Sequence, residues 1–336
     1  MAQRLATIFG GSGFIGRYLV RHLAAAGWRV RVAVRDTQKA QFLKTAGDLG
    51  QVSFIPASVT DPASVAAAVA GSDVVINLVG VLFDMSKRSF KAIHVDGAAT
   101  VARAAAAAGA ARLIHMSALG ADEHSPSAYA RSKAQGEAAV RAAFPTATIF
   151  RPSIVFGPED GFFNLYGLIA QVLPFIPYFT NTNPRAPEGG GASFQPVYVL
   201  DVVQAMMKAI TDNGHAGRTY ELCGPRIYSM RDIVELVNRA TMRNRMIVGL
   251  PYIAAWGPIA VGAVVRAVLR YATPLLPTAD QVKLLKMGNV ATGRLPGLEA
   301  FGIAPTMPDV IVPTYLKRFR PLQQNKRLRT PARHGA

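Results

Sequence analysis

The first half of the chain alternates short continuous apolar runs with segments in which apolar residues recur at helical spacing. Continuous apolar runs predict strands that are buried on both faces, as in a parallel sheet, and the periodic segments predict helices between them. The apolar runs predict strands at 5–9, 52–55, 74–78 and 113–116, an alternating pattern predicts a strand at 29–34, and the predicted helices are 14–26, 62–69 and 94–108. Strands separated by single helices form right-handed βαβ units, so we expect an α/β fold with a doubly wound parallel sheet.

The second half of the chain has a different residue pattern. Seven prolines between residues 152 and 196 interrupt the pattern, and three glycines at 189–191 predict an exposed loop. We expect 197–199 and 219–222 to be late strands that rejoin the sheet, and 230–240, 252–271 and 278–286 to be helices. The expected parts are a core of residues 1–150, a first excursion of 151–196, a return to the core of 197–223, a smaller and mainly helical C-terminal region of 224–316, and a tail of 317–336.

Composition excludes two classes of protein. Half of the 336 residues are hydrophobic and only 17% are charged, so the chain buries enough apolar surface to fold, unlike a disordered segment. Its single cysteine excludes a scaffold that is held together by internal disulfides. Residues 1–4 lead directly into the first predicted strand, so we expect no signal peptide, and either a cytoplasmic protein or a matured organellar one.

A glycine-rich motif joins the first strand to the first helix. Residues 10–16 read Gly-Gly-Ser-Gly-Phe-Ile-Gly. Glycine allows a tight turn and the close approach of a pyrophosphate, and the N-terminus of the following helix offers free N–H groups to an anion. The order of strand, motif, helix and second strand therefore predicts a Rossmann-type core that binds a dinucleotide.

The residues after the second strand indicate which dinucleotide binds. An NAD site places a carboxylate there for the ribose 2′-hydroxyl, but the corresponding position is Val34. Arg35 follows it, and Arg17 follows the last glycine of the motif, so two cations near the 2′ position favour NADP(H). In the alternative interpretation both arginines are surface charges and Asp36 takes the acidic role. Asp61, after the third strand, is placed to reach the adenine, to cap the next helix, or both.

A Tyr-x-x-x-Lys pair is the candidate for proton chemistry. Tyr129 and Lys133 are spaced to share one helix face, where an ammonium stabilises a phenolate and lowers its pKa from about 10 toward neutrality. Ser117, at the end of the preceding strand, is placed to bond a substrate carbonyl. These three residues are the catalytic candidates. In the alternative interpretation, Tyr129 and Lys133 only hold the nicotinamide ribose.

The chain resembles an extended or atypical short-chain dehydrogenase/reductase over roughly residues 4–245. The likeness rests on the glycine motif, the Tyr129–Lys133 pair and segments 151–157, 197–202 and 220–225. Within that superfamily it is most similar to the nucleotide-binding accessory subunit of respiratory complex I, NADH:ubiquinone oxidoreductase, in segments 115–121, 127–137, 142–145 and 151–164. The resemblance implies tight NADPH binding with little or no turnover. It also implies a place on the peripheral arm close to the membrane, where the subunit supports assembly and stability.

One departure from the superfamily pattern concerns catalysis. Ser117 lies twelve residues before Tyr129, a shorter interval than in typical active extended reductases.

We expect no metal site, and we expect Cys223, His94 and His115 to be structural. The complete set of cofactor-binding candidates is Gly10, Gly11, Ser12, Gly13, Phe14, Ile15, Gly16, Arg17, Arg35, Asp61, Val79, Gly80, Tyr129, Lys133 and Pro152.

Charge and hydrophobicity are concentrated toward the C-terminus. The chain has 37 basic and 20 acidic residues, a formal charge of +17, and residues 317–336 contain seven basic residues and no acid. This tail is either a solvated segment or a docking segment for an acidic partner or anionic lipid. Residues 246–265 carry no charge and are interpreted as a buried helix, an interfacial element or, against their prolines and glycines, a transmembrane helix. The uncharged stretch 165–179 is expected to pack beside them.

Three functions are compatible with these patterns. The first is an NADPH-holding accessory subunit of complex I, whose partners are other subunits of the peripheral arm and an anionic membrane surface. The resemblance places it at the cytoplasmic face of the inner membrane, or on the matrix side in an organelle. The second is a free-standing NADP-dependent reductase, epimerase or dehydratase that uses Tyr129 and Lys133, and the third is a redox-sensing regulator. No nucleic-acid-binding motif is present.

Overall fold

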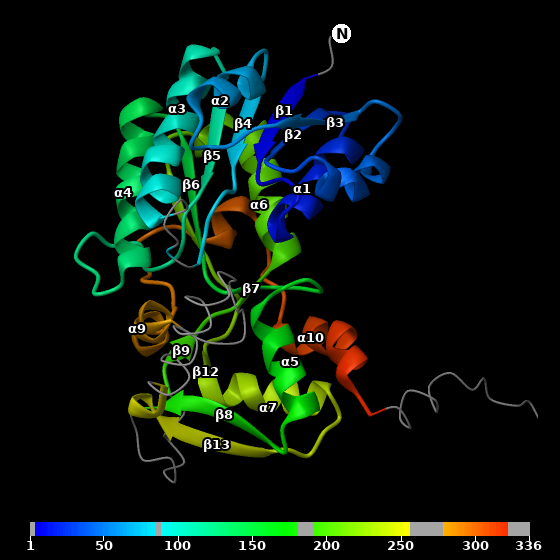
Figure 1. Cartoon of the computed structure of the whole chain (residues 1–336), viewed down its shortest axis with the longest axis vertical. Coiled ribbons are helices and arrows are strands. Elements are labelled where there is room, and N and C mark those ends of the chain that lie inside the picture. Colours follow the sequence, from blue (N-terminus) through cyan, green and yellow to red (C-terminus); the bar gives the residue numbers. More distant parts are fainter. Residues whose placement is uncertain (1–3, 83, 85–88, 181–190, 256–277, 322–336) are drawn as a thin grey trace, which may run out of the picture. The chain divides into compact units, whose positions relative to one another are not determined.

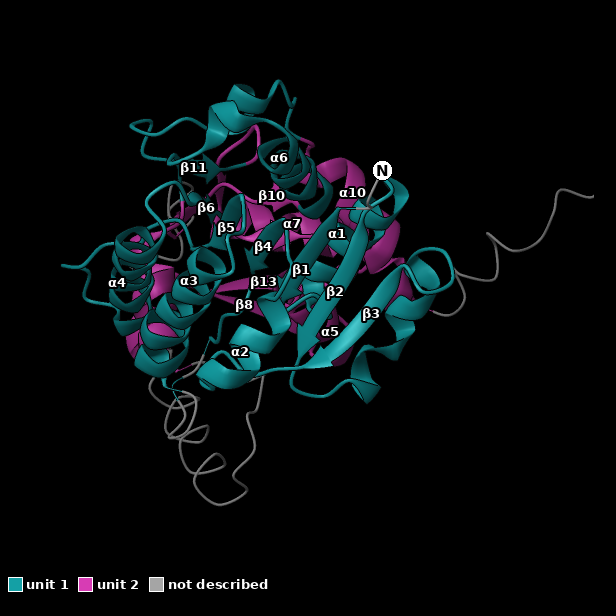
Figure 2. Ribbon diagram, turned by 90° about the horizontal axis from the view of Figure 1, so that it is seen from above, with its two compact units in different colours: residues 1–153, 199–223, 290–305 teal, residues 154–198, 224–289, 306–336 magenta. Residues whose placement is uncertain are grey.

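The computed structural model describes residues 4–82, 84, 89–180, 191–255 and 278–321 (Figure 1). The chain divides into two compact units, drawn in teal and magenta in Figure 2. The first contains Met1–Ser153, Val199–Cys223 and Val290–Pro305, and the second contains Ile154–Tyr198, Gly224–Asn289 and Thr306–Ala336. Residues 290–305, which the sequence pattern placed in the C-terminal region, thus belong to the first unit.

A seven-stranded parallel sheet forms the centre of the first unit. Its strands are β1 (Leu5–Phe9), β2 (Arg29–Val34), β3 (Val52–Pro56), β4 (Val74–Asn77), β5 (Arg112–Met116), β6 (Thr148–Pro152) and β11 (Thr219–Leu222). They lie in the order β11-β6-β5-β4-β1-β2-β3, and every neighbouring pair is parallel. The order reverses between β1 and β4, and α/β sheets bind their ligands at the carboxyl ends of the strands beside such a point.

Helices cover both faces of this sheet. On one face α2 (Pro62–Val69), α3 (Gly97–Ala107) and α4 (Ala128–Ala143) pack side by side, and on the other α1 (Phe14–Ala25) packs beside α6 (Val199–Thr211) (Figure 2). The core under the first group is built from alanine and β-branched side chains, among them Val65, Val75, Val101 and Val140. These small residues allow the alanine-rich helices to lie close to the strands.

The predicted doubly wound α/β fold is confirmed, with small shifts at the ends of elements. The strands 5–9 and 29–34 and the helix 62–69 have the predicted bounds. The predicted helix 94–108 starts earlier, with a π-helical turn, η2 (Lys91–Asp96), that continues into α3. The first unit also contains the 3₁₀ helices η1 (Gln38–Ala46), η3 (Asn213–His215) and η5 (Leu298–Phe301).

The second unit combines helices with three short strand pairs. Its helices α5 (Phe162–Val172), α7 (Met230–Ala240) and α10 (Pro308–Leu316) pack against one another, and α9 (Ala279–Met287) precedes the return to the first unit. The strand pairs are β7 (Val155–Phe156) with β10 (Val197–Tyr198), β9 (Ser193–Phe194) with β12 (Tyr228–Ser229), and β8 (Phe175–Thr180) with β13 (Met246–Pro251). The buried Asp160 carboxylate connects α5 to α10 by accepting from Phe163 N and Tyr315 Oη, both at 2.6 Å.

Two sequence predictions for the second half are wrong. Segment 197–199 does not rejoin the main sheet, because β10 pairs with β7 and α6 begins at Val199, whereas 219–222 rejoins it as predicted. Residues 246–251 are not helical but form β13, in parallel register with β8. The expected contact between the two uncharged stretches is confirmed for 175–179 with 246–250, but between strands. An apolar run alone does not distinguish a strand from a helix.

The predicted helix 252–271 is described only at its start. Tyr252–Ala255 forms a 3₁₀ turn, η4, and residues 256–271 lie outside the described residues. Within the described ranges, no helix combines the length and the apolar character that crossing a membrane requires.

The first residues of the predicted basic tail are folded onto the second unit. Lys317–Phe319 form a 3₁₀ turn, η6, and Phe319 packs so closely on Gly167 that an added Cβ would lie 2.6 Å from its ring. Arg320 Nε donates to the Ala240 carbonyl at the end of α7 at 3.0 Å, which complements the negative end of the helix dipole. Three of the seven tail cations are therefore part of the fold, and the other four lie outside the described residues.

Candidate functional site

The glycine motif forms the turn between β1 and α1, beside the point where the strand order reverses. Gly10 has a φ of +78°, which favours glycine. At Gly16 an added Cβ would lie 2.5 Å from the Gly10 carbonyl oxygen and 2.6 Å from Gly11 Cα. The Gly13 N–H donates to the Gly10 carbonyl at 2.9 Å, and α1 begins without a side-chain cap or an acidic residue in its first turn. The turn therefore requires glycine and suits a phosphate at the start of α1.

The remaining motif candidates lie at the start of α1. Ser12, Phe14 and Ile15 are half-buried. Arg17 Nε donates to the Gly13 carbonyl at 3.3 Å, and its guanidinium lies 5.2 Å from the centroid of the Phe42 ring. The Arg17 side chain is therefore held between the glycine turn and η1.

The end of β2 presents one cation and one capping carboxylate. Val34 is buried, whereas Arg35 and Asp36 are exposed. Asp36 Oδ1 accepts the N–H groups of Gln38 at 3.0 Å and Lys39 at 3.2 Å. These backbone hydrogen bonds, the one from Lys39 above all, hold the pKa of Asp36 below its usual range. The Asp36 carboxylate therefore caps the start of η1.

Asp61, Val79, Gly80 and Pro152 lie at or beyond the carboxyl ends of β3, β4 and β6. Asp61 Oδ1 accepts the Ala63 N–H at 3.1 Å, so its capping role is confirmed, and its contact with adenine stays a prediction. Val79 and Gly80 follow β4 in the segment that runs past the glycine turn, and Pro152 ends β6.

Tyr129, Lys133 and Ser117 are contributed by α4 and by the end of β5. The buried Lys133 Nζ donates to the Met116 carbonyl at 3.2 Å and lies 5.9 Å from the centroid of the Tyr129 ring. It would lie 3.3 Å from a Cβ added at Gly80. Ser117 is 4% exposed, and its Oγ has no hydrogen-bond partner among the described residues. A buried hydroxyl without a partner costs about 1–3 kcal/mol, so this position suits a ligand that bonds to it.

Burial determines the protonation of both Tyr129 and Lys133. It raises the pKa of Tyr129 to about 12, and it lowers the pKa of Lys133 to about 8 against the opposing charge of Glu137. The expectation that the pKa of Tyr129 lies near neutrality is wrong for this site, because removal from water disfavours the phenolate. The phenol is therefore protonated at neutral pH.

Sequence reasoning missed the contribution of His94 to this cluster. His94 lies in η2; its Nε2 accepts the Val81 N–H at 3.0 Å, and its Nδ1 lies 2.8 Å from Ser132 Oγ. His115, at the end of β5, is buried beside Asn77. Burial, with a smaller contribution from the Lys133 charge, lowers the pKa of each histidine to about 3. The sequence carried no signal for the π-helical turn that makes the His94 contacts possible.

The two buried histidines predict that stability falls in mild acid. Each is neutral when folded, with a pKa near 3, and becomes protonated near 6.5 when unfolded, so the unfolded state binds more protons between these values. The free energy of unfolding should therefore fall below pH 6.5 by up to about 1.4 kcal/mol per pH unit for each histidine. Urea unfolding at pH 7.0, 6.0 and 5.0 measures this slope, and a flat profile would contradict the burial of neutral histidines.

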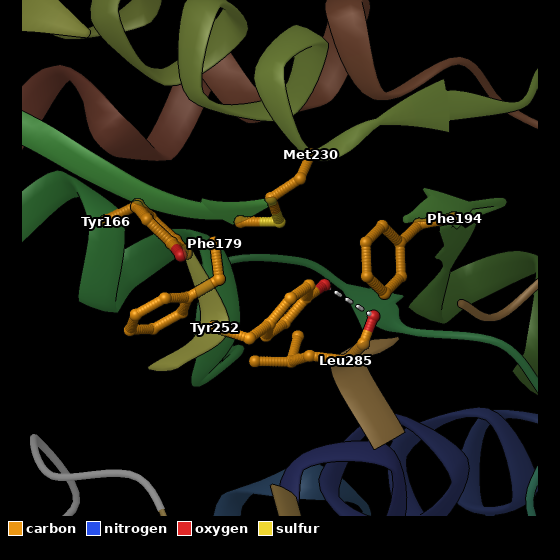
Figure 3. A pocket seen from close by; sticks show the side chains of 6 residues that line it. All are labelled: Tyr166, Phe179, Phe194, Met230, Tyr252 and Leu285. Carbon is orange, nitrogen blue, oxygen red and sulfur yellow. Dashed lines mark hydrogen bonds between the residues drawn. The ribbon is translucent and has the colours of Figure 1, made fainter. Parts of the chain in front are cut away.

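Two cavities are lined by other residues. In the second unit Tyr166, Phe179, Phe194, Met230, Tyr252 and Leu285 surround a void of about 10 Å³ (Figure 3), which holds no more than about one water. In the first unit, an open cleft of about 400 Å³ lies between residues 121–124 and α4, and the Glu137–Arg151 ion pair lines it. Neither cavity includes the glycine turn or Lys133.

The sheet order and the glycine turn define the class of this molecule as a Rossmann-type α/β protein. The model of the NAD dependent epimerase/dehydratase family matches residues 6–223, and the chain belongs to that family.

Known relatives differ in the roles that their names give. The chain is 34% identical over 320 residues to the mouse (Mus musculus) protein NADH dehydrogenase (ubiquinone) 1 alpha subcomplex subunit 9, mitochondrial. The aligned region covers 94% of this chain and 80% of the mouse protein. It is 39% identical over 186 residues to a ceramide reductase of Caulobacter vibrioides, with 54% of this chain and 56% of that protein covered. The Thermus thermophilus UDP-glucose 4-epimerase in complex with NAD has the same fold, with a TM-score of 0.67, 17% identity, and coverage of 95% of this chain and 99% of the epimerase.

Proposed function

We propose that this chain is a nucleotide-binding accessory subunit of respiratory complex I, which supports the assembly and stability of the peripheral arm near the membrane. The observation that carries the proposal is the 34% identity to the mouse complex I subunit across 94% of this chain and 80% of that subunit. The family model ends at residue 223 and so omits most of the second unit. The likeness to the mouse subunit covers nearly the whole chain and therefore extends into this unit.

The residues of the first unit fit an NADPH molecule. The glycine turn would take the pyrophosphate, Arg17 and Arg35 the 2′-phosphate, and Lys133 the hydroxyls of the nicotinamide ribose, with Ser117 Oγ as a further donor. Two features support this fit: the space that only glycine leaves at residue 16, and the buried hydroxyl of Ser117, for which the described part of the chain supplies no hydrogen-bond partner. NADPH supplies a hydride donor when it is bound.

A mainly structural role for the nucleotide is supported by Tyr129. General acid–base catalysis is most effective when the pKa of the group lies near the working pH. Burial raises the pKa of the Tyr129 phenol to about 12, well above neutral pH, so the group is poorly matched to acid–base catalysis there. We infer that Tyr129 and Lys133 hold the nucleotide rather than turn it over.

The preference for NADPH gives a direct prediction at Arg35. Replacing Arg35 by aspartate exchanges a cation for an anion at the 2′-phosphate and should weaken NADPH binding by about 30-fold or more, as the loss of a charged hydrogen bond of about 2 kcal/mol predicts. Binding of NADH should be unchanged or tighter. Titration of nicotinamide fluorescence measures both. Arg29→Asp, with the same charge change at the opposite end of β2, is the matched control, and equal losses in both variants would contradict the assignment.

The second unit offers a surface for the proposed membrane contact. Val172 and Met246 are each 68% exposed; Val172 ends α5, and Met246 pairs with Phe175, the first residue of the following strand β8. Arg243 and Arg245 precede Met246 in the chain. Apolar side chains flanked by arginines suit an anionic membrane surface, where each cation contributes up to about 1 kcal/mol.

A second candidate function is a free-standing NADP-dependent reductase, epimerase or dehydratase. The 39% identity to a ceramide reductase over 186 residues favours it, and Tyr129 and Lys133 are both present. This function requires steady oxidation of NADPH by a carbonyl substrate, lost in Tyr129→Phe. The subunit proposal instead requires that membranes from cells lacking this chain contain less assembled NADH:ubiquinone oxidoreductase. Normal assembly together with turnover of the isolated chain would favour the enzyme.

A further inference from the structure

We propose that His94 is a positioning residue of the nucleotide site, which fixes the segment after β4 over Lys133 and so orders the end of the site that holds the nicotinamide ribose. This inference rests on the proposed binding of a nucleotide. It assigns a role to a side chain that neither the glycine motif nor the Tyr129–Lys133 pair includes.

A close approach of η2 to α4 places His94 in this position. The His94 carbonyl oxygen lies 2.1 Å from where a Cβ at Gly136 would be, so only glycine permits the approach. The π-helical turn Lys91–Asp96 adds a residue to one turn of the helix and directs the imidazole toward α4. Such turns inside helices are frequent at functional sites. The backbone geometry thus brings the His94 ring to Ser132, one residue before Lys133.

The hydrogen bonds of His94 define its tautomer. Nε2 accepts the Val81 N–H at 3.0 Å, so the proton resides on Nδ1, which donates to Ser132 Oγ at 2.8 Å. Ser132 Oγ in turn donates to the Tyr129 carbonyl at 2.7 Å. One neutral imidazole therefore connects the segment after β4 to the α4 turn that carries Tyr129 and Lys133.

Ring packing restricts the imidazole further. It stacks on Phe90 with 5.4 Å between the ring centroids and meets the Tyr129 ring edge-on at 5.4 Å. Phe90 also contacts Tyr129 edge-on at 5.8 Å. With the ring fixed, the bond to Val81 determines where Gly80 lies, and Gly80 is the residue whose Cβ position is 3.3 Å from Lys133 Nζ. Loss of the bond should therefore loosen the backbone over the lysine and leave the glycine turn unchanged.

The test uses three variants of the whole chain. His94→Phe keeps a stacking ring but leaves the Val81 N–H without an acceptor, and His94→Gln restores an acceptor near the Nε2 position. His215→Phe is the matched control, because His215 is a buried histidine of the same unit that bonds Tyr220 Oη at 2.7 Å. The readouts are hydrogen exchange at the Val81 amide and the affinities for NADPH and for adenosine 2′,5′-bisphosphate, which lacks the nicotinamide half.

Positioning by His94 predicts a specific pattern. In His94→Phe the Val81 amide should exchange at least tenfold faster and NADPH should bind about tenfold more weakly, as the loss of one buried hydrogen bond predicts. Affinity for adenosine 2′,5′-bisphosphate should be unchanged, His94→Gln should recover part of both losses, and His215→Phe should change neither. Unchanged Val81 exchange in His94→Phe, or equal weakening of both ligands, would overturn the inference. If the unaltered chain binds no NADPH, the proposed function fails, whereas the exchange data still report whether His94 holds Val81.

Discussion

Replacing Gly16 by alanine should abolish measurable nucleotide binding, with an affinity loss of at least 100-fold. An added Cβ would lie 2.5 Å from the Gly10 carbonyl oxygen and 2.6 Å from Gly11 Cα, and both atoms belong to the backbone of the glycine turn. A side chain cannot be accommodated there by rotation of a neighbour, so the turn or α1 must move. Because the pyrophosphate is expected to bind this turn directly, the displacement that relieves these contacts disrupts its hydrogen bonds. NADPH fluorescence titration measures the loss.

The control for Gly16→Ala separates local damage from general destabilisation. Gly224→Ala in the second unit has an equally severe conflict, with its Cβ 2.0 Å from the Pro196 carbonyl oxygen. Overpacking of this kind costs about 1–3 kcal/mol, so both variants should be less stable. Only Gly16→Ala should lose the nucleotide. Normal NADPH affinity in Gly16→Ala would show that the turn does not hold the pyrophosphate.

Replacing Arg151 by leucine should lower the free energy of unfolding by about 3–5 kcal/mol, the cost of leaving a buried charge without its partner. Arg151 Nε and Nη2 donate to the two carboxylate oxygens of Glu137 at 2.8 and 2.7 Å, and the Glu137 side chain is 8% exposed. The pair joins β6 to α4, one turn after Lys133. The hydrogen bonds that Arg151 donates to Glu137 raise the pKa of Arg151 above its ordinary value, so the arginine stays charged at neutral pH. Urea unfolding measures the change.

The exposed pair Arg231–Glu235 is the comparison for this ion pair. Its side chains are 42% and 37% exposed, and Glu235→Gln should cost no more than about 0.5 kcal/mol. Combining Arg151→Leu with Glu137→Gln removes both charges and should recover part of the stability that the single variant loses. A single variant as stable as Glu235→Gln would show that water reaches Glu137.

The strands of the central sheet are predictable from sequence because their signal is local. Segment 5–9 is a mainly apolar run that is buried along its whole length, and segment 29–34 alternates arginine with valine before it ends in an apolar run. The strands β8 and β13 are not predictable in this way. Prolines and a glycine lie inside them, and each is stabilised by pairing with a segment about seventy residues away in the chain. The uncharged run at 246–265 therefore looked helical although it begins as a strand.

The candidate site likewise combines features that are predictable from consecutive residues with features that depend on the fold. The glycine turn and the spacing of Tyr129 and Lys133 are properties of consecutive residues, so the sequence shows them. The pKa of Tyr129 depends on burial, which no spacing reports, and the prediction that considered only Lys133 had the wrong direction. His94 meets Ser132 across 38 positions, through a π-helical turn and a glycine that permits the approach. Only a three-dimensional structure brings such contacts together.

Affinity purification of the tagged chain from gently solubilised membranes of its source tests the central claim most directly. The eluate is assayed for NADH:ubiquinone oxidoreductase activity and for bound nucleotide, at low and at high salt. The account predicts that the oxidoreductase co-purifies with about one NADPH per tagged chain. High salt should weaken the association of the chain with lipid but not its association with the oxidoreductase. A chain that emerges alone, with exchangeable nucleotide and no oxidoreductase activity in the eluate, would contradict it.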